Sequence, residues 1–175
     1  MDAFVCLRCA AVNPTCCRMD PTCAHLCFPL SAPEKDRLSP HARAMGLPAA
    51  AVEKTSEEFL QAMRSLFPDR KSRINTLFPI PGEHLRLPTA PDGACLFLSE
   101  EGCRLPGSAR PWYCQLFPMW IRRERLDMFL PGDCLVAREA RSLKNSLELL
   151  AMTREEVRNL YAALCRDWGL TPEEA

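Results

Sequence analysis

Eleven cysteines constrain this chain of 175 residues more than any other feature, because its fold must place every one of their sulfurs. Only three histidines accompany them. Three explanations compete for so many thiols, namely disulfide bonds, ligation of a metal or cluster, and burial in the core as small hydrophobic side chains. The cysteines are Cys6, Cys9, Cys16, Cys17, Cys23, Cys27, Cys95, Cys103, Cys114, Cys134 and Cys165.

Disulfide bonds are the weakest of these explanations. The number of cysteines is odd, and the N-terminus, MDAFVCLRCA, lacks the basic segment and long apolar run of a signal peptide. A chain of this length can also build a core without covalent cross-links. We therefore expect a cytoplasmic protein whose thiols stay reduced. No apolar run reaches the roughly 18 residues of a membrane span, so no membrane partner is expected.

The charge balance bears on the partners of the protein. With 22 basic and 22 acidic side chains, the formal net charge is zero. Nucleic-acid-binding domains usually carry a clear basic excess, so we expect no nucleic-acid partner. An apolar share of 47% is ordinary for a soluble globular chain, and we expect a single domain over residues 1–175.

Helix signals are concentrated in residues 31–68. Ser31 and Glu34 have the spacing of a capping box, which predicts a helix that ends near Leu38 or continues past Pro40. A second helix is predicted after Thr55 or Ser56, where apolar residues recur along one face until Pro68.

The segment 134–169 is predicted to form two further helices. Apolar residues recur at spacings of three and four from Val136 to Leu150, and Thr153 and Glu156 form a second capping box. We expect these helices to form a C-terminal hairpin. The predicted fold class is α+β and rich in helix, with short strands around a small, irregular, cysteine-organised metal-binding core.

The cysteine-rich segments 1–30 and 92–138 are predicted to be ligand loops. Two residues separate Cys6 from Cys9, a spacing that lets both thiolates reach one ion. The neighbours Cys16 and Cys17 suit ligation of two ions, or one ligand and one supporting thiol. Cys165 lies within the last predicted helix, and we expect it to be a core thiol.

The stretch RPWYCQLFP, residues 110–118, surrounds Cys114 with prolines. Pro111 and Pro118 each fix a backbone dihedral and remove a hydrogen-bond donor, which predicts a rigid loop in place of a regular helix. The aromatic residues of this region are expected to shield the sulfurs from water. They are Trp112, Tyr113, Phe117 and Trp120.

Several short motifs, in order, resemble the YkgJ-type zinc- or iron-chelating domain family. They are CLRC, CC at 16–17, DGACLFL, GC at 102–103, RPWYCQLFP and CLVAR at 134–138, and together they span residues 6–138. Six residues separate Cys9 from Cys16, where the family commonly has two, and Cys23 and Cys27 are additional. The resemblance implies metal ligation by Cys6, Cys9, Cys16, Cys17, Cys95, Cys103, Cys114 and Cys134.

Residues around these cysteines leave alternatives open. Arg110 is either a donor that offsets the negative charge of thiolates around a cofactor or a surface arginine. His25, between Cys23 and Cys27, is either an extra ligand or an exposed loop histidine.

Thiolate ligation suits zinc and iron–sulfur clusters alike. Eight sulfurs could hold two closed zinc sites or one cluster with spare thiols, and bulky apolar cover slightly favours the cluster. We expect a protein that binds an iron–sulfur cluster or zinc, and a protein partner is left open as an alternative. The alternatives are metal delivery and a cluster-dependent redox or protein-modifying enzyme, since flagellin lysine N-methylases carry a similar segment. The sequence contains no G-x-S-x-G, P-loop or H-E-x-x-H motif.

Overall fold

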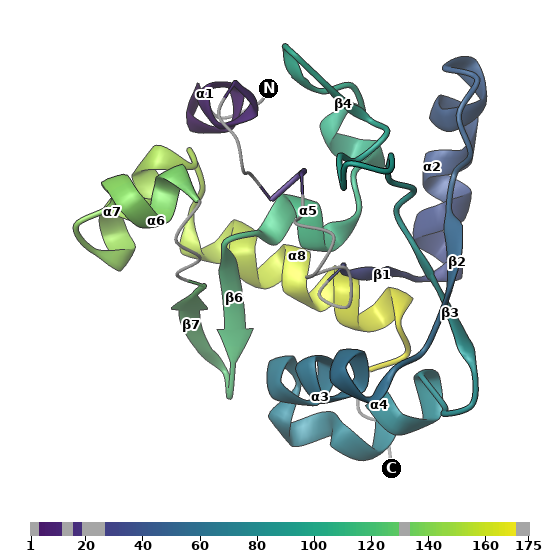
Figure 1. Ribbon diagram of the computed structural model, residues 1–175. Helices are drawn as coiled ribbons and strands as arrows, with labels where there is room; N and C mark the ends of the chain where they lie inside the picture. Colours follow the sequence, from purple (N-terminus) through teal and green to yellow (C-terminus); the bar gives the residue numbers. More distant parts are fainter. Residues whose placement is uncertain (1–3, 12–15, 19–26, 130–133, 171–175) are drawn as a thin grey trace.

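The fold mixes helices with three small antiparallel sheets, which confirms the α+β class (Figure 1). A computed structural model describes residues 4–11, 16–18, 27–129 and 134–170. The predictions for Cys23 and His25 lie outside these residues. No helix in the described ranges combines the length and apolar character needed to cross a bilayer.

Helix α8, at the centre of the molecule, packs against α5, β6 and α2 (Figure 1). The other helices are arranged around it. Their bounds are α1 Phe4–Ala10, α2 Ala32–Ala44, α3 Glu57–Leu66, α4 Lys71–Leu77, α5 Trp112–Leu116, α6 Leu135–Glu139, α7 Leu143–Leu149 and α8 Arg154–Asp167, with short 3-10 turns at Pro68–Arg70 and Gly107–Ala109.

The strands are short and pair locally. The three-stranded sheet has the order β1-β3-β2, and β3 places Leu85 between Leu30 and Val52. The other two sheets are hairpins, β4-β5 and β6-β7. The strand bounds are β1 Pro29–Leu30, β2 Ala51–Lys54, β3 Glu83–Arg86, β4 Leu98–Ser99, β5 Gly102–Cys103, β6 Met119–Arg122 and β7 Arg125–Met128.

The predicted helix starts are confirmed. Ser31 and Glu34 form the capping box of α2, and α2 continues through Pro40 to Ala44. Ser56 caps α3 by accepting a hydrogen bond from the backbone of Phe59. Thr153 and Glu156 form the capping box of α8. These contacts are local in sequence, so the pattern of residue types is enough to predict them.

The C-terminal helices differ from the predicted hairpin. Residues 134–150 form two helices, α6 and α7, because Ser142 adopts an extended backbone and starts a new helix by accepting a hydrogen bond from the backbone of Asn145. Helix α8 makes its main contacts with α5, β6 and α2 and not with α7.

Two predicted loops contain short helices. Cys6 and Cys9 lie in α1, and Cys114 lies in α5, so the prediction of a non-helical loop through Cys114 was wrong. Pro111 is the N-cap residue of α5, a position where proline loses no helical hydrogen bond. Pro118 lies beyond the last helical residue, so one helical turn fits between the two prolines.

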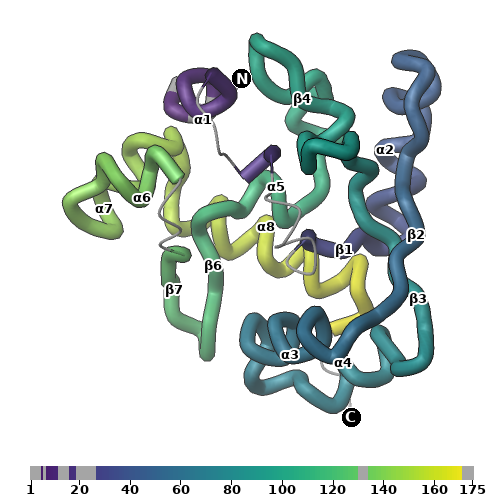
Figure 2. The backbone as a smooth tube through the Cα atoms, in the orientation of Figure 1, coloured from purple at the N-terminus to yellow at the C-terminus, as the bar shows by residue number. Residues whose placement is uncertain are grey.

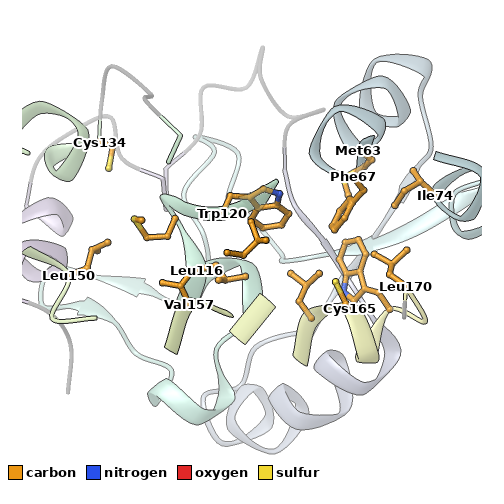
Figure 3. Packing of buried hydrophobic residues seen from close by; sticks show 14 of the residues in the cluster. Met63, Phe67, Ile74, Leu116, Trp120, Cys134, Leu150, Val157, Cys165 and Leu170 are labelled. Carbon is orange, nitrogen blue, oxygen red and sulfur yellow. The ribbon is translucent and has the colours of Figure 1, made fainter. Parts of the chain in front are cut away.

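The apolar interior consists of two clusters. The larger one, here called the main core, contains Phe67, Trp120 and Leu164 and extends to Cys134 at one end (Figure 3). The smaller one, here called the α2 core, consists of Leu38, Ala42, Phe97 and Leu105. In Figure 1, α2 lies to the right of α5, and α1 and α6 lie to its left.

The carboxylate of Glu34, only 2% exposed, links three helices. Its Oε1 accepts a hydrogen bond of 2.8 Å from the backbone N–H of Trp112, the first residue of α5. Its Oε2 accepts one of 2.8 Å from Nε1 of Trp168, at the end of α8. The same oxygen accepts from the backbone N–H and the hydroxyl of Ser31. Because α5 carries Cys114, Glu34 fixes the position of that cysteine.

Replacing Glu34 with alanine should strongly destabilise the protein. The substitution leaves the N–H of Trp112 and Nε1 of Trp168 without their acceptor in the interior. We expect E34A to lower the free energy of unfolding by about 3 kcal/mol or more, as measured by urea denaturation.

The exposed Glu101 provides the matched control. E101A should change the free energy of unfolding by less than about 0.5 kcal/mol. A loss below about 1 kcal/mol in E34A would show that the helices do not depend on this carboxylate.

Candidate metal centre

Seven of the eight predicted cysteine ligands line one cavity of about 140 Å³. The segments that carry them are far apart in sequence and meet around α5 (Figure 2). Cys6 lies in α1, but its side chain is not among those that the structure describes. The seven lining cysteines are Cys9, Cys16, Cys17, Cys95, Cys103, Cys114 and Cys134.

One wall of the cavity, here called the β wall, is built from backbone pairing. An antiparallel bridge joins Arg18 to Ala94, which places Cys17 opposite Cys95. The backbone N–H of Cys95 donates a 2.8 Å hydrogen bond to the carbonyl oxygen of Cys17. Residues opposite each other in such pairs have Cβ atoms about 5 Å apart.

Cys103 joins the β wall through the β4-β5 hairpin. It lies opposite Leu98, whose backbone N–H donates a 2.9 Å hydrogen bond to the carbonyl oxygen of Cys95. Cys95 and Cys103 both pack against the α2 core. The β wall therefore holds three thiols on one continuous, hydrogen-bonded framework.

A second group of lining residues, here called the helix wall, comes from α1 and α6, and α1 also packs against β5 of the β wall. Cys134 is the N-cap residue of α6 and belongs to the main core. Cys9 lies close to it: burial raises the pKa of Cys9, the backbone of Leu135 opposes this effect, and negative charge on Cys134 would raise the pKa further. Arg8 of α1 donates hydrogen bonds of 2.9 and 2.6 Å to the carboxylate of Glu139 in α6.

Cys114 supplies a further lining thiol from α5. It is solvent-accessible although protein surrounds it, because its surface faces the cavity. Arg110, just before α5, also lines the cavity. Its Nε donates a 3.0 Å hydrogen bond to the carbonyl oxygen of Leu105, and its Nη2 donates one of 3.3 Å to that of Cys103. These bonds hold the guanidinium beside the thiols.

The thiols of the cavity influence one another's protonation. Loss of solvation raises the pKa of Cys114 well above its usual value, and negative charge on Cys17, Cys95 or Cys103 raises it further. Desolvation also raises the pKa of Cys95, to about 12. Burial therefore favours the protonated form of Cys95 and Cys114, whereas a bound metal cation deprotonates the thiols that coordinate it.

Cys17 departs from this trend. Its Sγ lies 3.9 Å from that of Cys16, and the hydrogen bond between them lowers the pKa of Cys17. The positive charge of Arg110 lowers the same pKa further, while desolvation opposes both effects. The pKa of Cys16 is raised in return. Arg110 therefore lies beside the thiols, and its role as a charge-offsetting donor to a cofactor stays a prediction.

The thiols are distributed over the cavity surface. Among the described residues, no three cysteine, histidine, aspartate or glutamate side chains converge on a point that could hold one ion. The cysteines described by the structure are free thiols. Cys165 is buried in α8 within the main core, as predicted. Cys27 does not line the cavity and packs beside Arg86.

The aromatic cover differs from the prediction. Of the four aromatic residues expected to shield the sulfurs, only Phe117 lines the cavity. The ring of Trp112 packs under the guanidinium of Arg37, and its Nε1 donates a hydrogen bond to Asp167. Tyr113 stacks on Phe28. The apolar lining comes instead from aliphatic residues, which the cysteine motifs do not indicate. They include Val5, Leu7, Leu87, Leu105, Val136 and Leu150.

In the reduced, metal-free chain, Cys17 should react with iodoacetamide at a lower pH than Cys95. The thiolate is the reactive form, and the pKa of Cys17 is lowered while that of Cys95 is raised. C16A removes the hydrogen bond to Cys17 and should shift its reaction to higher pH. Peptide mass spectrometry after brief labelling measures both effects.

C27A provides a control for this experiment, because Cys27 is absent from the cavity lining. It should leave the pH dependence of Cys17 unchanged. Labelling of Cys95 at the same pH as Cys17, or at a lower pH, would contradict the prediction that the pKa of Cys17 is the lower of the two.

Comparisons with known proteins identify no relative of this chain. No protein-family model, curated protein or solved structure matches the chain. The likeness to the YkgJ-type domain therefore depends only on the motifs in the sequence.

Proposed function

We propose that this protein binds an iron–sulfur cluster or zinc through the thiols of the cavity. One observation carries the proposal, namely that seven cysteines from five separate segments line a single cavity. Thiolate sulfur is the donor that both zinc and iron–sulfur clusters prefer. Chance burial of cysteine as a small hydrophobic residue does not account for such a gathering.

The size of the cavity favours a centre with more than one metal atom. A cavity that holds one water molecule needs only about 10–15 Å³, whereas this one has about 140 Å³. Its thiols are spread over the walls and do not converge on one point. Both properties suit a multi-atom cluster, or several ions, better than one tetrahedral ion.

The surroundings of the thiols suit the same role. Arg110 is held in place by two backbone carbonyls and would partly offset the negative charge of a thiolate-bound centre. Aliphatic side chains limit the access of water, which affects the reduction potential of a cluster. A bound cluster would supply one-electron chemistry, and bound zinc would cross-link the segments.

Metal binding is better supported than acid–base catalysis. Among the described residues that line the cavity, the ionisable side chains are cysteines and Arg110. Neither a carboxylate nor an imidazole is among them. General acid–base catalysis usually relies on such groups.

Anaerobic purification followed by elemental analysis and absorption spectroscopy tests this proposal. A cluster should give broad absorbance near about 400 nm that bleaches on reduction, whereas zinc should give a colourless protein with stoichiometric metal. C114A removes a central thiol and should lower the metal content that survives dialysis against a chelator.

C165A is the matched control, because Cys165 is a buried thiol of the main core outside the cavity lining. It should retain the metal content of the unaltered protein. An unaltered protein that contains neither iron nor zinc, and takes up neither under reducing conditions, would contradict the proposal.

A further inference from the structure

We propose that Cys16 and Cys17 form a reversible oxidation site, where a hydroperoxide joins the two neighbouring sulfurs in a disulfide bond. The Sγ atoms of these residues lie 3.9 Å apart, and both residues line the cavity. The inference goes beyond the proposed metal-binding function and does not depend on it, because the reaction uses only two thiols of the metal-free chain.

The two sulfurs are close enough for side-chain rotation to join them. A disulfide bond is about 2.05 Å long, so the sulfurs must approach by a further ~1.9 Å. The carbonyl oxygen of Cys17 accepts a hydrogen bond from the backbone of Cys95, and Arg18 is bridged to Ala94, so the backbone on one side of the pair is fixed. Cys16 is exposed, which leaves its side chain room to rotate towards Cys17.

The cavity has space for the oxidant beside the sulfurs. Its volume is about 140 Å³, whereas a water molecule needs only about 10–15 Å³, so hydrogen peroxide or a small organic hydroperoxide fits. The hydrogen bond from Cys16 and the positive charge of Arg110 lower the pKa of Cys17, which favours Cys17 as the attacking sulfur. The proposal depends on the positions of the two sulfurs, since either one can attack and the other can complete the bond.

The reaction has two steps. The thiolate of one residue attacks an oxygen of the hydroperoxide, so that an S–O bond forms, the O–O bond breaks, and the second oxygen takes up a proton and leaves as an alcohol or water. The neighbouring thiol sulfur then attacks the sulfenic acid, so that an S–S bond forms, the S–O bond breaks, and the oxygen leaves as water with the proton of the thiol. The two thiols lose two electrons in total, and the hydroperoxide gains them.

The geometry of neighbouring residues makes this link reversible. Consecutive Cα atoms are about 3.8 Å apart, which is less than the roughly 4.4–6.8 Å that a disulfide usually spans. A link between neighbours is therefore strained, and strained disulfides are readily reduced. While the link is present, neither sulfur is available to a metal centre, so the oxidation state of the pair would also set the number of thiols that the cavity offers.

Peptide mapping of the reduced, metal-free full chain tests the proposal. After treatment with hydrogen peroxide, free thiols are blocked with iodoacetamide and the chain is digested with trypsin, which cuts after Arg8 and Arg18 and releases residues 9–18. This peptide contains Cys9, Cys16 and Cys17. We expect one blocked thiol, on Cys9, and a loss of two hydrogen atoms from the linked pair. Dithiothreitol should restore three thiols that can be blocked.

Three variants locate the link. C9A should keep it, which assigns the link to the neighbouring pair. C16A should lose it and leave Cys17 as a sulfenic acid that dimedone traps. C165A, altered in a core thiol outside the cavity lining, should match the unaltered protein. Circular dichroism verifies the fold of each variant, and the unaltered protein decides by itself if a variant does not fold.

Three blocked thiols in the peptide after peroxide treatment, or loss of the link in folded C9A, would overturn the inference. A link from Cys16 or Cys17 to any other cysteine would overturn it too. Metal uptake is measured separately, on the reduced chain. A chain that forms the link but takes up neither iron nor zinc supports this inference and contradicts only the proposed function, whereas a chain that takes up metal but forms no link does the reverse.

Discussion

The buried carboxylate of Glu34 is the interaction on which the helix arrangement depends most directly. The carboxylate forms a local capping box with Ser31, and it also accepts hydrogen bonds from residues 78 and 134 positions away in the sequence. A carboxylate removed from water is costly unless donors surround it, and here four donors from three helices do so. The requirement is mutual, since the indole N–H of Trp168 and the first N–H of α5 also need an acceptor in the interior.

A neighbouring carboxylate extends this network towards the surface. Asp167 accepts hydrogen bonds from Nε1 of Trp112 and from the guanidinium of Arg37, which also lies over the ring of Trp112. Helices α2, α5 and α8 are therefore fixed by polar contacts as well as by apolar packing. The cysteine segments are short, but they contribute buried apolar residues such as Val5, Phe97 and Leu116. Backbone pairing and Arg110 hold the β wall, while the helix wall depends on α1 and α6.

The sequence predicts features that depend on neighbouring residues. Ser31, Ser56 and Thr153 each accept a hydrogen bond from a backbone N–H three positions later, so their helix starts follow from residue type and spacing. Cysteine motifs also indicate which thiols line the cavity, although the structure places these thiols in different local settings, such as helix α5 for Cys114 and strand β5 for Cys103. Seven of the eight candidates do line it.

Features that depend on distant residues are not visible in the sequence. The helix through Cys114 forms where two prolines predict a loop, and part of its stabilisation comes from Glu34 in another helix. The division of the thiols between two walls follows from the bridge between Arg18 and Ala94 and from the packing of α1 on α6. Neither contact has a local signature, because each joins segments separated by many residues.

The position of the cavity has a consequence for the cooperativity of unfolding. Of the residues that line the cavity, Leu105 belongs to the α2 core, and Val5 and Val136 belong to the main core. A group bound in the cavity would contact both cores, so unfolding of one core would remove contacts that stabilise the other. Occupancy of the cavity would therefore decide whether the α2 core and the main core unfold in a single calorimetric transition or in two overlapping ones.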